Sequence, residues 1–211
     1  MPLESLTMIR HGESTGNVAR AVALSQGAEV MDIPERDADV PLSELGRGQA
    51  AAVGDRLAAE ERPDLILSSP YLRARETAEI ALKASGSPAT TLDERLRDRE
   101  GGAFYGLTWA GITARHPDEA SRFARDGKFY YRPPGGESWA DVALRLRFLL
   151  AGLDGRVLVF SHDAVIVLAR YILGGLTEAE VMEIEKTPIA NCSITRWERG
   201  RLVLYNDLGH M

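Results

Sequence analysis

The chain has 211 residues, 45% of them hydrophobic and 27% charged, and this length buries a substantial core without disulfides or a structural metal. The net charge of −6 and the pI of 5.3 argue against an extended nucleic-acid surface. The apolar runs are too short to span a bilayer, and residues 1–5 lack the pattern of a signal peptide. The single cysteine, Cys192, cannot form an internal disulfide, which favours a reducing cytoplasm.

The first predicted strand, residues 6–9, leads directly into Arg10 and His11. In an open α/β sheet, ligands bind just beyond the carboxyl ends of parallel strands, so this cation and this imidazole are placed to meet a substrate. The residues that follow allow close backbone approach or offer hydrogen bonds to phosphate-like oxygens: Gly12, Ser14, Thr15, Gly16 and Asn17. Taken alone, the stretch fits equally well a strand end with two solvated polar residues.

The next stretch predicts a loop and an amphipathic helix. Residues 18–40 are expected to begin as a helix and to continue as a long surface loop near the mouth of the site. Ser43 is a candidate cap for a second helix, which Pro63 cannot continue. The expected apolar face of that helix consists of Leu45, Ala50, Val53 and Leu57.

A second strand is predicted at residues 64–67, and the Ser-Ser-Pro sequence at 68–70 predicts the start of the next helix. Arg73 would lie in the first turn of that helix, where the positive end of the helix favours an anion. The alternative is a solvated helix arginine like Arg75. A third strand is expected at residues 89–92.

Residues 93–106 combine many charges with glycines, which predicts a loop and a shaped turn beside a pocket. Residues 108–127 predict two helical pieces broken near His116 and Pro117. Residues 128–137 predict a loop rich in rings. These rings, with Phe104 and Tyr105, either line a pocket for an apolar leaving group or pack beneath a loop.

The last third predicts an alternation of helices and strands. Ser138 is the expected cap of a helix whose core positions are Trp139, Val142, Leu146, Leu149, Leu150 and Leu153. Residues 156–160 predict a buried strand that ends at His162, followed by helices at 163–173 and 177–184. An antiparallel pair is expected from residues 193–197 and 201–205. Without repeats or a linker, the pattern predicts a single domain over residues 1–211.

Two of the four histidines, His11 and His162, stand at the ends of separate predicted parallel strands, which favours a shared site. The chain has no H-E-x-x-H pattern and no cysteine cluster, the usual signatures of a metal site. It also lacks the G-x-x-x-x-G-K-[ST] loop for nucleotides and the G-x-S-x-G turn of esterases.

Four motifs resemble the histidine phosphatase superfamily, the phosphoglycerate mutase-like proteins, and occur in the family's order over nearly the whole chain. They are Arg10-His11-Gly12-Glu13-Ser14, the segment 68–78 around Arg73, the segment 95–108 around Asp98, and Ser161-His162. The resemblance implies a three-layer α/β/α sandwich with a mostly parallel central sheet.

The resemblance also implies the roles of the site residues. His11 would attack phosphorus and carry the phosphoryl group covalently. Arg10, Arg73 and His162, with Asn17 as a neutral donor, would stabilise the phosphoryl oxygens without a metal or another cofactor.

Asp98 would give a proton to the leaving oxygen, with Glu100 as the rival donor. Because the donor must carry a proton in the first step, this assignment predicts either a raised pKa of Asp98 or faster turnover at acid pH.

The chain departs from the family pattern at two positions. Many relatives carry glutamate where this chain has Asp98, and many carry glycine where it has Asp163. Asp163 is expected to orient His162, to shape the substrate pocket or to favour the start of the following helix. Glu137 matches a family position near the pocket. With Ser14, Thr15, Gly16 and Asn17, these residues complete the expected substrate-binding set.

The predicted function is a metal-independent phosphomonoesterase that acts on a small phosphorylated metabolite. One alternative is a 2,3-bisphosphoglycerate-dependent phosphoglycerate mutase, although such enzymes generally carry a longer insertion over the site. Another is a catalytically inactive protein that binds a phosphorylated ligand. Nucleic-acid and membrane partners are not expected, and a homodimer through a sheet edge is an open alternative.

Overall fold

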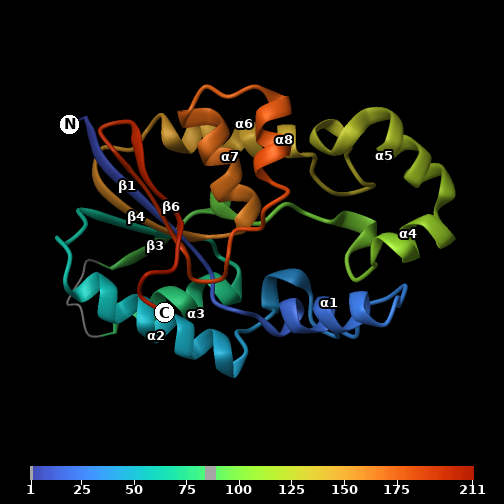
Figure 1. Ribbon diagram of the computed structural model, residues 1–211, viewed down its shortest axis with the longest axis horizontal. Coiled ribbons are helices and arrows are strands. Elements are labelled where there is room, and N and C mark those ends of the chain that lie inside the picture. Colours follow the sequence, from blue (N-terminus) through green and yellow to red (C-terminus); the bar gives the residue numbers. More distant parts are fainter. Residues whose placement is uncertain (1, 84–88) are drawn as a thin grey trace.

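A computed structural model describes residues 2–83 and 89–211, and these residues form a six-stranded sheet in the order β3-β2-β4-β1-β5-β6 (Figure 1). The strands β3, β2, β4 and β1 are parallel, whereas β5 and β6 form an antiparallel hairpin beside β1. The strands are β1 (Leu3–Arg10), β2 (Leu65–Ser68), β3 (Thr90–Leu92), β4 (Gly155–Ser161), β5 (Ile194–Glu198) and β6 (Arg201–Asp207). The mostly parallel sheet and the terminal hairpin are confirmed.

Helices cover both faces of the sheet, which confirms the three-layer α/β/α sandwich. Figure 1 shows α2 and α3 on one side of the sheet and α6, α7 and α8 on the other. The helices are α1 (Thr15–Ser25), α2 (Glu44–Ala58), α3 (Leu72–Leu82), α4 (Trp109–Arg115), α5 (Pro117–Tyr130), α6 (Trp139–Leu150), α7 (Asp163–Leu173) and α8 (Glu178–Ile184). Short 3₁₀ turns lie at Asp37–Asp39, Glu94–Leu96 and Gly102–Phe104.

The central strand β4 supplies both hydrophobic cores. Val157 and Val159 pack into the cluster formed with α6 and α7, whereas Leu158 and Phe160 pack into the cluster beneath α2 and α3. Successive side chains of a strand point to opposite faces, so one apolar run serves both layers. Each buried side chain of this size contributes about 1.5–3 kcal/mol to stability, and the central strands are therefore firmly held.

Two predicted helix starts are confirmed by their caps. The Ser43 hydroxyl accepts a hydrogen bond from the backbone N–H of Gly46, and Ser138 forms a capping box with Asp141 at the start of α6. The predicted core positions of α6 are buried, apart from Leu153, which is partly buried. The break between α4 and α5 at His116 and Pro117 is confirmed as well.

Three local predictions were wrong. Leu45 does not belong to the buried face of α2, since it is 59% exposed; Gly46 faces inward instead, and a Cβ there would lie 2.0 Å from the carbonyl oxygen of Glu13. The helix α3 begins at Leu72, not at Pro70, because the Ser69 hydroxyl accepts from the N–H of Tyr71 in a turn. The helix α5 continues through residues 128–130, past a non-helical Gly127.

Candidate active site

The parallel pairing of β1 with β4 brings the two predicted histidines together. Arg10 is in register with Ser161, so the next residue of each strand, His11 or His162, leaves the sheet at the same edge. Both side chains are buried, and their ring centroids lie 5.2 Å apart in an edge-to-face arrangement. The sheet register therefore fixes the distance between the two imidazoles.

The hydrogen bonds of His11 define its tautomer. Nδ1 lies 2.7 Å from the carbonyl oxygen of Gly12, and because a carbonyl only accepts, Nδ1 carries the hydrogen. Nε2 then holds a lone pair and accepts from Nε of Arg73 at 3.3 Å. Burial lowers the pKa of His11 well below its ordinary value, and Arg73 adds to this effect. His11 is therefore a neutral imidazole near pH 7, with its lone pair on Nε2.

The backbone around His11 is held by contacts from distant parts of the chain. The N–H of Gly12 donates to the Thr77 hydroxyl at 3.0 Å, and a Cβ on Gly12 would lie 2.5 Å from the carbonyl oxygen of Gly46. The Asn191 amide donates to the carbonyl oxygen of His11 at 2.9 Å. These contacts leave little room for the loop to move.

Arg73 is buried, whereas Arg75 of the same helix is exposed, so the reading of Arg73 as a solvated helix arginine is excluded. Its Nη1 donates to the carbonyl oxygen of Asp37 at 2.6 Å and lies 2.9 Å from the Asp37 carboxylate. Its Nη2 donates to Oδ2 of Asp98 at 3.1 Å. The guanidinium thus joins His11 to two carboxylates.

Arg10 supplies a second cation to the same cavity. Its Nη1 donates to the carbonyl oxygen of Ile189, and its buried Nε has no partner among residues 2–83 and 89–211. A buried donor without a partner is costly, and a ligand oxygen at this position would satisfy it.

One ring nitrogen of His162 faces Ser69, and the other faces Asp98. Nε2 forms a hydrogen bond with the Ser69 hydroxyl at 2.8 Å. Nδ1 lies 3.4 Å from Oδ2 of Asp98 and has no hydrogen-bond partner within the described ranges. Burial lowers the pKa of His162 well below its ordinary value, and Arg73 and Arg10 add to this effect.

The structure distinguishes the two acids that the sequence offered as proton donors. Asp98 lines the cavity and contacts both Arg73 and His162. Glu100 lies outside the cavity lining, where it accepts from the N–H of Gly102 at 3.2 Å and from the Tyr71 hydroxyl at 3.5 Å. Of the two, Asp98 is the acid beside the paired histidines.

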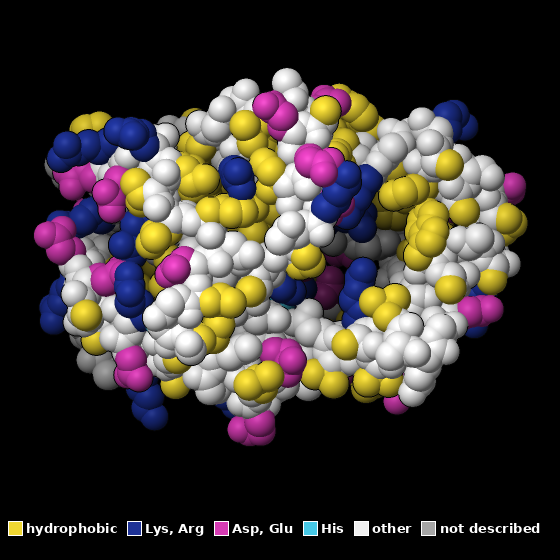
Figure 2. All heavy atoms as spheres, viewed as in Figure 1, with side chains coloured by type: hydrophobic (Ala, Val, Ile, Leu, Met, Phe, Trp, Pro, Cys, Tyr) yellow, Lys and Arg dark blue, Asp and Glu magenta, His cyan; other side chains and the backbone are white. Residues whose placement is uncertain are grey.

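The cavity has a volume of about 640 Å³, far more than a phosphoryl group fills. Figure 2 shows a hollow on this face, with acidic and basic side chains on its walls. Six rings also line the cavity: Phe104, Tyr105, Trp109, Phe123, Tyr131 and Trp139. Phe129 instead packs in the core against Tyr171. Phe104, Tyr105 and Tyr131 therefore line the cavity, whereas Phe129 packs in the core.

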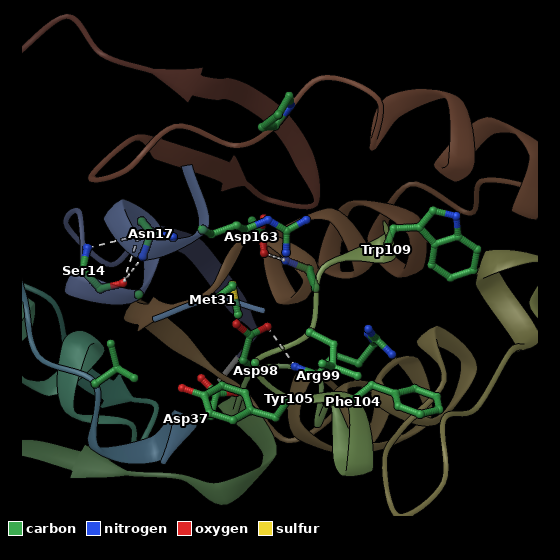
Figure 3. A pocket seen from close by; sticks show the side chains of 18 of the residues that line it. Ser14, Asn17, Met31, Asp37, Asp98, Arg99, Phe104, Tyr105, Trp109 and Asp163 are labelled. Carbon is green, nitrogen blue, oxygen red and sulfur yellow. Dashed lines mark hydrogen bonds between the residues drawn. The ribbon is translucent and has the colours of Figure 1, made fainter. Parts of the chain in front are cut away.

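Four of the six expected substrate-binding residues line the cavity: Ser14, Gly16, Asn17 and Asp163 (Figure 3). Ser14 caps α1 in a capping box with Asn17. The Asn17 carbonyl oxygen accepts from Ser14 and from Asn191, so its amide nitrogen is the group available to a ligand. Asp163 is the first residue of α7, and its carboxylate accepts from the N–H of Ala164.

The other two residues lie outside the cavity lining. Thr15 is exposed, and its backbone N–H donates to the carbonyl oxygen of Pro41. The Glu137 carboxylate accepts from Arg145 at 2.9 and 3.0 Å and from the N–H of Glu100 at 3.2 Å. Glu137 therefore holds the loop that carries Asp98.

Sequence reasoning missed four residues that shape the site: Asp37, Ser69 as the partner of His162, Arg145 and Asn191. Ser69 lies inside a recognised motif, so its position was a usable signal. Asp37, Asn191 and Arg145 reach the site from 36, 180 and 47 residues away along the chain, and no local pattern marks them.

The described ranges contain neither a metal-binding cluster nor a membrane-spanning helix. No three His, Cys, Asp or Glu side chains of residues 2–83 and 89–211 gather as a metal-binding group. Within the same ranges, every helix is too short or too polar to cross a membrane.

Comparison with known sequences identifies the same family over most of the chain. Residues 6–204 match the model of the histidine phosphatase superfamily, branch 1. Glucosyl-3-phosphoglycerate phosphatase of Mycobacterium tuberculosis is 35% identical over 90% of this chain and 79% of that protein. A metal-independent phosphoserine phosphatase of Arabidopsis thaliana is 31% identical over 76% and 65%.

The chain is also similar to a mutase in sequence and to a solved phosphatase in structure. A 2,3-bisphosphoglycerate-dependent phosphoglycerate mutase of Gloeobacter violaceus is 32% identical over 89% of this chain and 82% of that protein. The solved native structure of a mycobacterial glucosyl-3-phosphoglycerate phosphatase superposes with a TM-score of 0.77, at 31% identity, and covers 97% of this chain and 99% of that one. The chain is therefore a phosphatase that belongs to the histidine phosphatase superfamily, branch 1.

Proposed function

We propose that this phosphatase hydrolyses phosphomonoesters without a metal, through a phosphohistidine on Nε2 of His11. One observation carries the proposal: Nδ1 of His11 is committed to the carbonyl oxygen of Gly12, which leaves the lone pair on Nε2 beside Arg73. A buried, neutral imidazole with a fixed tautomer is a suitable nucleophile for phosphorus.

In the first step, Nε2 of His11 attacks phosphorus, and the bond between phosphorus and the leaving oxygen breaks. Asp98 gives its proton to that oxygen, so the product leaves as an alcohol. Arg10, Arg73 and His162 stabilise the charge on the remaining oxygens, with the Asn17 amide as a further donor.

In the second step, water attacks phosphorus and the bond between phosphorus and Nε2 of His11 breaks. The Asp98 carboxylate, left ionised by the first step, takes the proton of the attacking water. Phosphate is released, and both residues return to their starting forms. The site thus completes a hydrolysis with two guanidinium groups as the source of positive charge.

The experiment is phosphate release from a panel of phosphomonoesters in EDTA, with His11→Ala as the control. The proposal expects turnover that persists in EDTA, is lost in the variant, and passes through an acid-labile ³²P label on wild type. Turnover that requires a divalent cation, or that survives in His11→Ala, would overturn it.

We further propose that the substrate is a small phosphorylated metabolite with a ring-containing leaving group. The support is the row of six rings along a cavity much larger than a phosphoryl group. The name of the mycobacterial relative, glucosyl-3-phosphoglycerate phosphatase, agrees with a leaving group that carries a ring. The panel therefore pairs sugar and aryl phosphates with phosphoserine and 3-phosphoglycerate.

The mutase remains the second candidate, favoured by the 32% identity to the Gloeobacter violaceus enzyme. A mutase returns the phosphoryl group from His11 to a bound product, so it requires 2,3-bisphosphoglycerate and releases little phosphate. The cytoplasmic location and the homodimer stay predictions from the sequence.

A further inference from the structure

The carboxylate of Asp37 occupies a binding position on the cation that is expected to hold the phosphoryl group. Asp37 lies in the 3₁₀ turn between α1 and α2, and both its carboxylate and its carbonyl oxygen contact Nη1 of Arg73, at 2.9 and 2.6 Å. The residue lines the cavity wall, and its side chain is about four-fifths buried, with 21% exposed. It belongs to none of the family motifs in the sequence.

The three nitrogens of the Arg73 guanidinium all have partners. Nε donates to His11, Nη1 to Asp37 and Nη2 to Asp98. A phosphoryl group in line with Nε2 of His11 needs the same guanidinium edge. Its oxygens must therefore share donors with the two carboxylates or displace one of them.

The two carboxylates differ in what the proposed reaction needs. Asp98 also contacts His162, and it gives and takes a proton in the proposed mechanism. Asp37 has no such role, so its negative charge acts on the bound phosphoryl group only by repulsion and by competition for Arg73. Two negative charges close to one partly buried cation repel each other more strongly than in water.

The chain around Asp37 is anchored, so the carboxylate is held at this position. The Tyr105 hydroxyl donates to the carbonyl oxygen of Glu35 at 3.1 Å, and within the turn the backbone N–H of Asp39 donates to the carbonyl oxygen of Arg36 at 2.8 Å. Figure 3 shows Asp37 and Tyr105 on the same part of the cavity wall. The turn thus presents a fixed negative charge to Arg73.

We propose that the Asp37 carboxylate weakens the binding of the phosphoryl dianion at Arg73 and thereby promotes release of phosphate. The inference rests on the proposed function, since it places phosphate against Arg73 and His11. The Asp37 carboxylate and the phosphate compete for Nη1 of Arg73, and the carboxylate binds Nη1 again as the product leaves.

The competition depends on pH because Asp37 competes only when ionised. Burial raises the pKa of Asp37, the positive charge of Arg73 partly offsets this, and the charges of Asp98 and Glu100 add to the rise. Two tyrosines also face this carboxylate, and both stay neutral in this range, since burial raises the pKa of Tyr105 to about 12 and raises the pKa of Tyr71 as well. As the pH falls, protonation removes the competing charge.

The experiment measures the Kd of inorganic phosphate by calorimetry for wild type, Asp37→Asn and Asp37→Ser, from pH 8 to pH 5. Both variants are expected to bind phosphate about tenfold more tightly at pH 8, the scale of one like charge removed from a partly buried site. The ratio to wild type is expected to become smaller as the pH is lowered, because protonation removes the charge of Asp37 in wild type. Asp39→Asn, in the same turn but away from Arg73, is the matched control and is expected to leave Kd unchanged.

Phosphate binding that is equal or weaker in Asp37→Asn and Asp37→Ser would overturn the inference and make Asp37 a support for Arg73. Thermal unfolding of each variant shows that the folded protein is being compared. Because phosphate binding requires no turnover, this failure would leave the phosphohistidine proposal intact. Failure of wild type to bind phosphate, together with turnover that survives in His11→Ala, would instead overturn the proposed function.

Discussion

Oδ2 of Asp98 lies 3.4 Å from Nδ1 of His162, and the same oxygen lies 3.1 Å from Nη2 of Arg73. One carboxylate oxygen therefore faces both groups that are expected to hold the phosphoryl oxygens. A leaving oxygen bound beside them is within reach of this carboxyl group.

We predict that Asp98→Asn lowers kcat about 10²–10⁴-fold for alkyl phosphates but far less for p-nitrophenyl phosphate. An alkoxide needs a proton as it leaves, whereas p-nitrophenolate does not. Glu100→Gln is the matched control and should retain most of its activity on both substrates. Equal losses on the two substrates would show that Asp98 does not act as the acid.

Substitution of Arg73 by alanine should lower kcat/KM by about 2–4 kcal/mol of transition-state stabilisation. The guanidinium is buried beside His11, and water cannot replace its directed donors. Arg75→Ala, two residues farther along the same helix and exposed, should have kinetics like wild type. Steady-state kinetics of both variants on one substrate provide the comparison, and similar losses in the two would contradict this assignment.

Arg145 should position the Asp98 loop. It donates to both carboxylate oxygens of Glu137 and to the carbonyl oxygens of Arg95 and Asp98. Arg145→Met should lower the free energy of unfolding by about 3 kcal/mol, because it leaves the Glu137 carboxylate largely buried and unpaired.

The double variant Arg145→Met/Glu137→Gln should recover part of that loss in a denaturant titration. Both variants should lose more activity on alkyl phosphates than on p-nitrophenyl phosphate. A loss of stability with no change in that preference would limit Arg145 to a structural role.

Stability should decline as the pH falls below about 6.5, partly because of the two buried histidines. Burial lowers the pKa of His11 and of His162 in the folded protein. The unfolded chain therefore binds more protons between pH 6.5 and the lowered values, which favours unfolding. Replacing either histidine with glutamine should flatten the fall of Tm between pH 6.5 and pH 5. An unchanged slope in both variants would show that these histidines do not titrate on unfolding.

Trp109→Ala should reduce kcat/KM about tenfold for naphthyl phosphate and little for phosphoserine. The indole lines the cavity and is 47% exposed, so its removal should affect ligand contact more than folding. Tyr130→Ala removes a ring of similar exposure that lies outside the cavity lining and is the matched control. Parallel changes on both substrates would place the leaving group elsewhere.

The sequence predicts elements whose information is local. The apolar run that became β4 and the Ser138 cap of α6 were both recognisable, because strand periodicity and caps depend on a few neighbouring residues. The start of α3 was not, since Ser69 uses its hydroxyl for Tyr71 and His162 instead of a cap. Leu45 shows the same limit of local patterns. It is exposed, and Gly46 faces inward in its place, against the backbone of Glu13, which lies 33 residues earlier in the chain.

The candidate site likewise combines residues that local motifs predict with residues that they do not. His11, Arg73 and His162 follow from strand ends and recognised motifs, and the structure places them together. Asp37, Asn191 and Arg145 depend on how distant segments fold back, and no spacing rule marks such contacts. Thr15 and Glu137 were expected near the substrate, but one is exposed and the other is bound to Arg145.

His11 and His162 leave the adjacent strands β1 and β4 side by side, and this arrangement affects which parts of the fold open to solvent. The N–H of His11 donates to the carbonyl oxygen of Ser161, so the histidine pair continues the hydrogen bonding of the two central strands. Amides of such central strands exchange with solvent only through global unfolding. The helices α4 and α5 extend to one side in Figure 1 and make few contacts with the sheet. Their amides exchange through local openings that cost less free energy. We therefore expect α4 and α5, which carry Trp109 and Phe123 of the cavity wall, to open locally while His11 and His162 stay aligned.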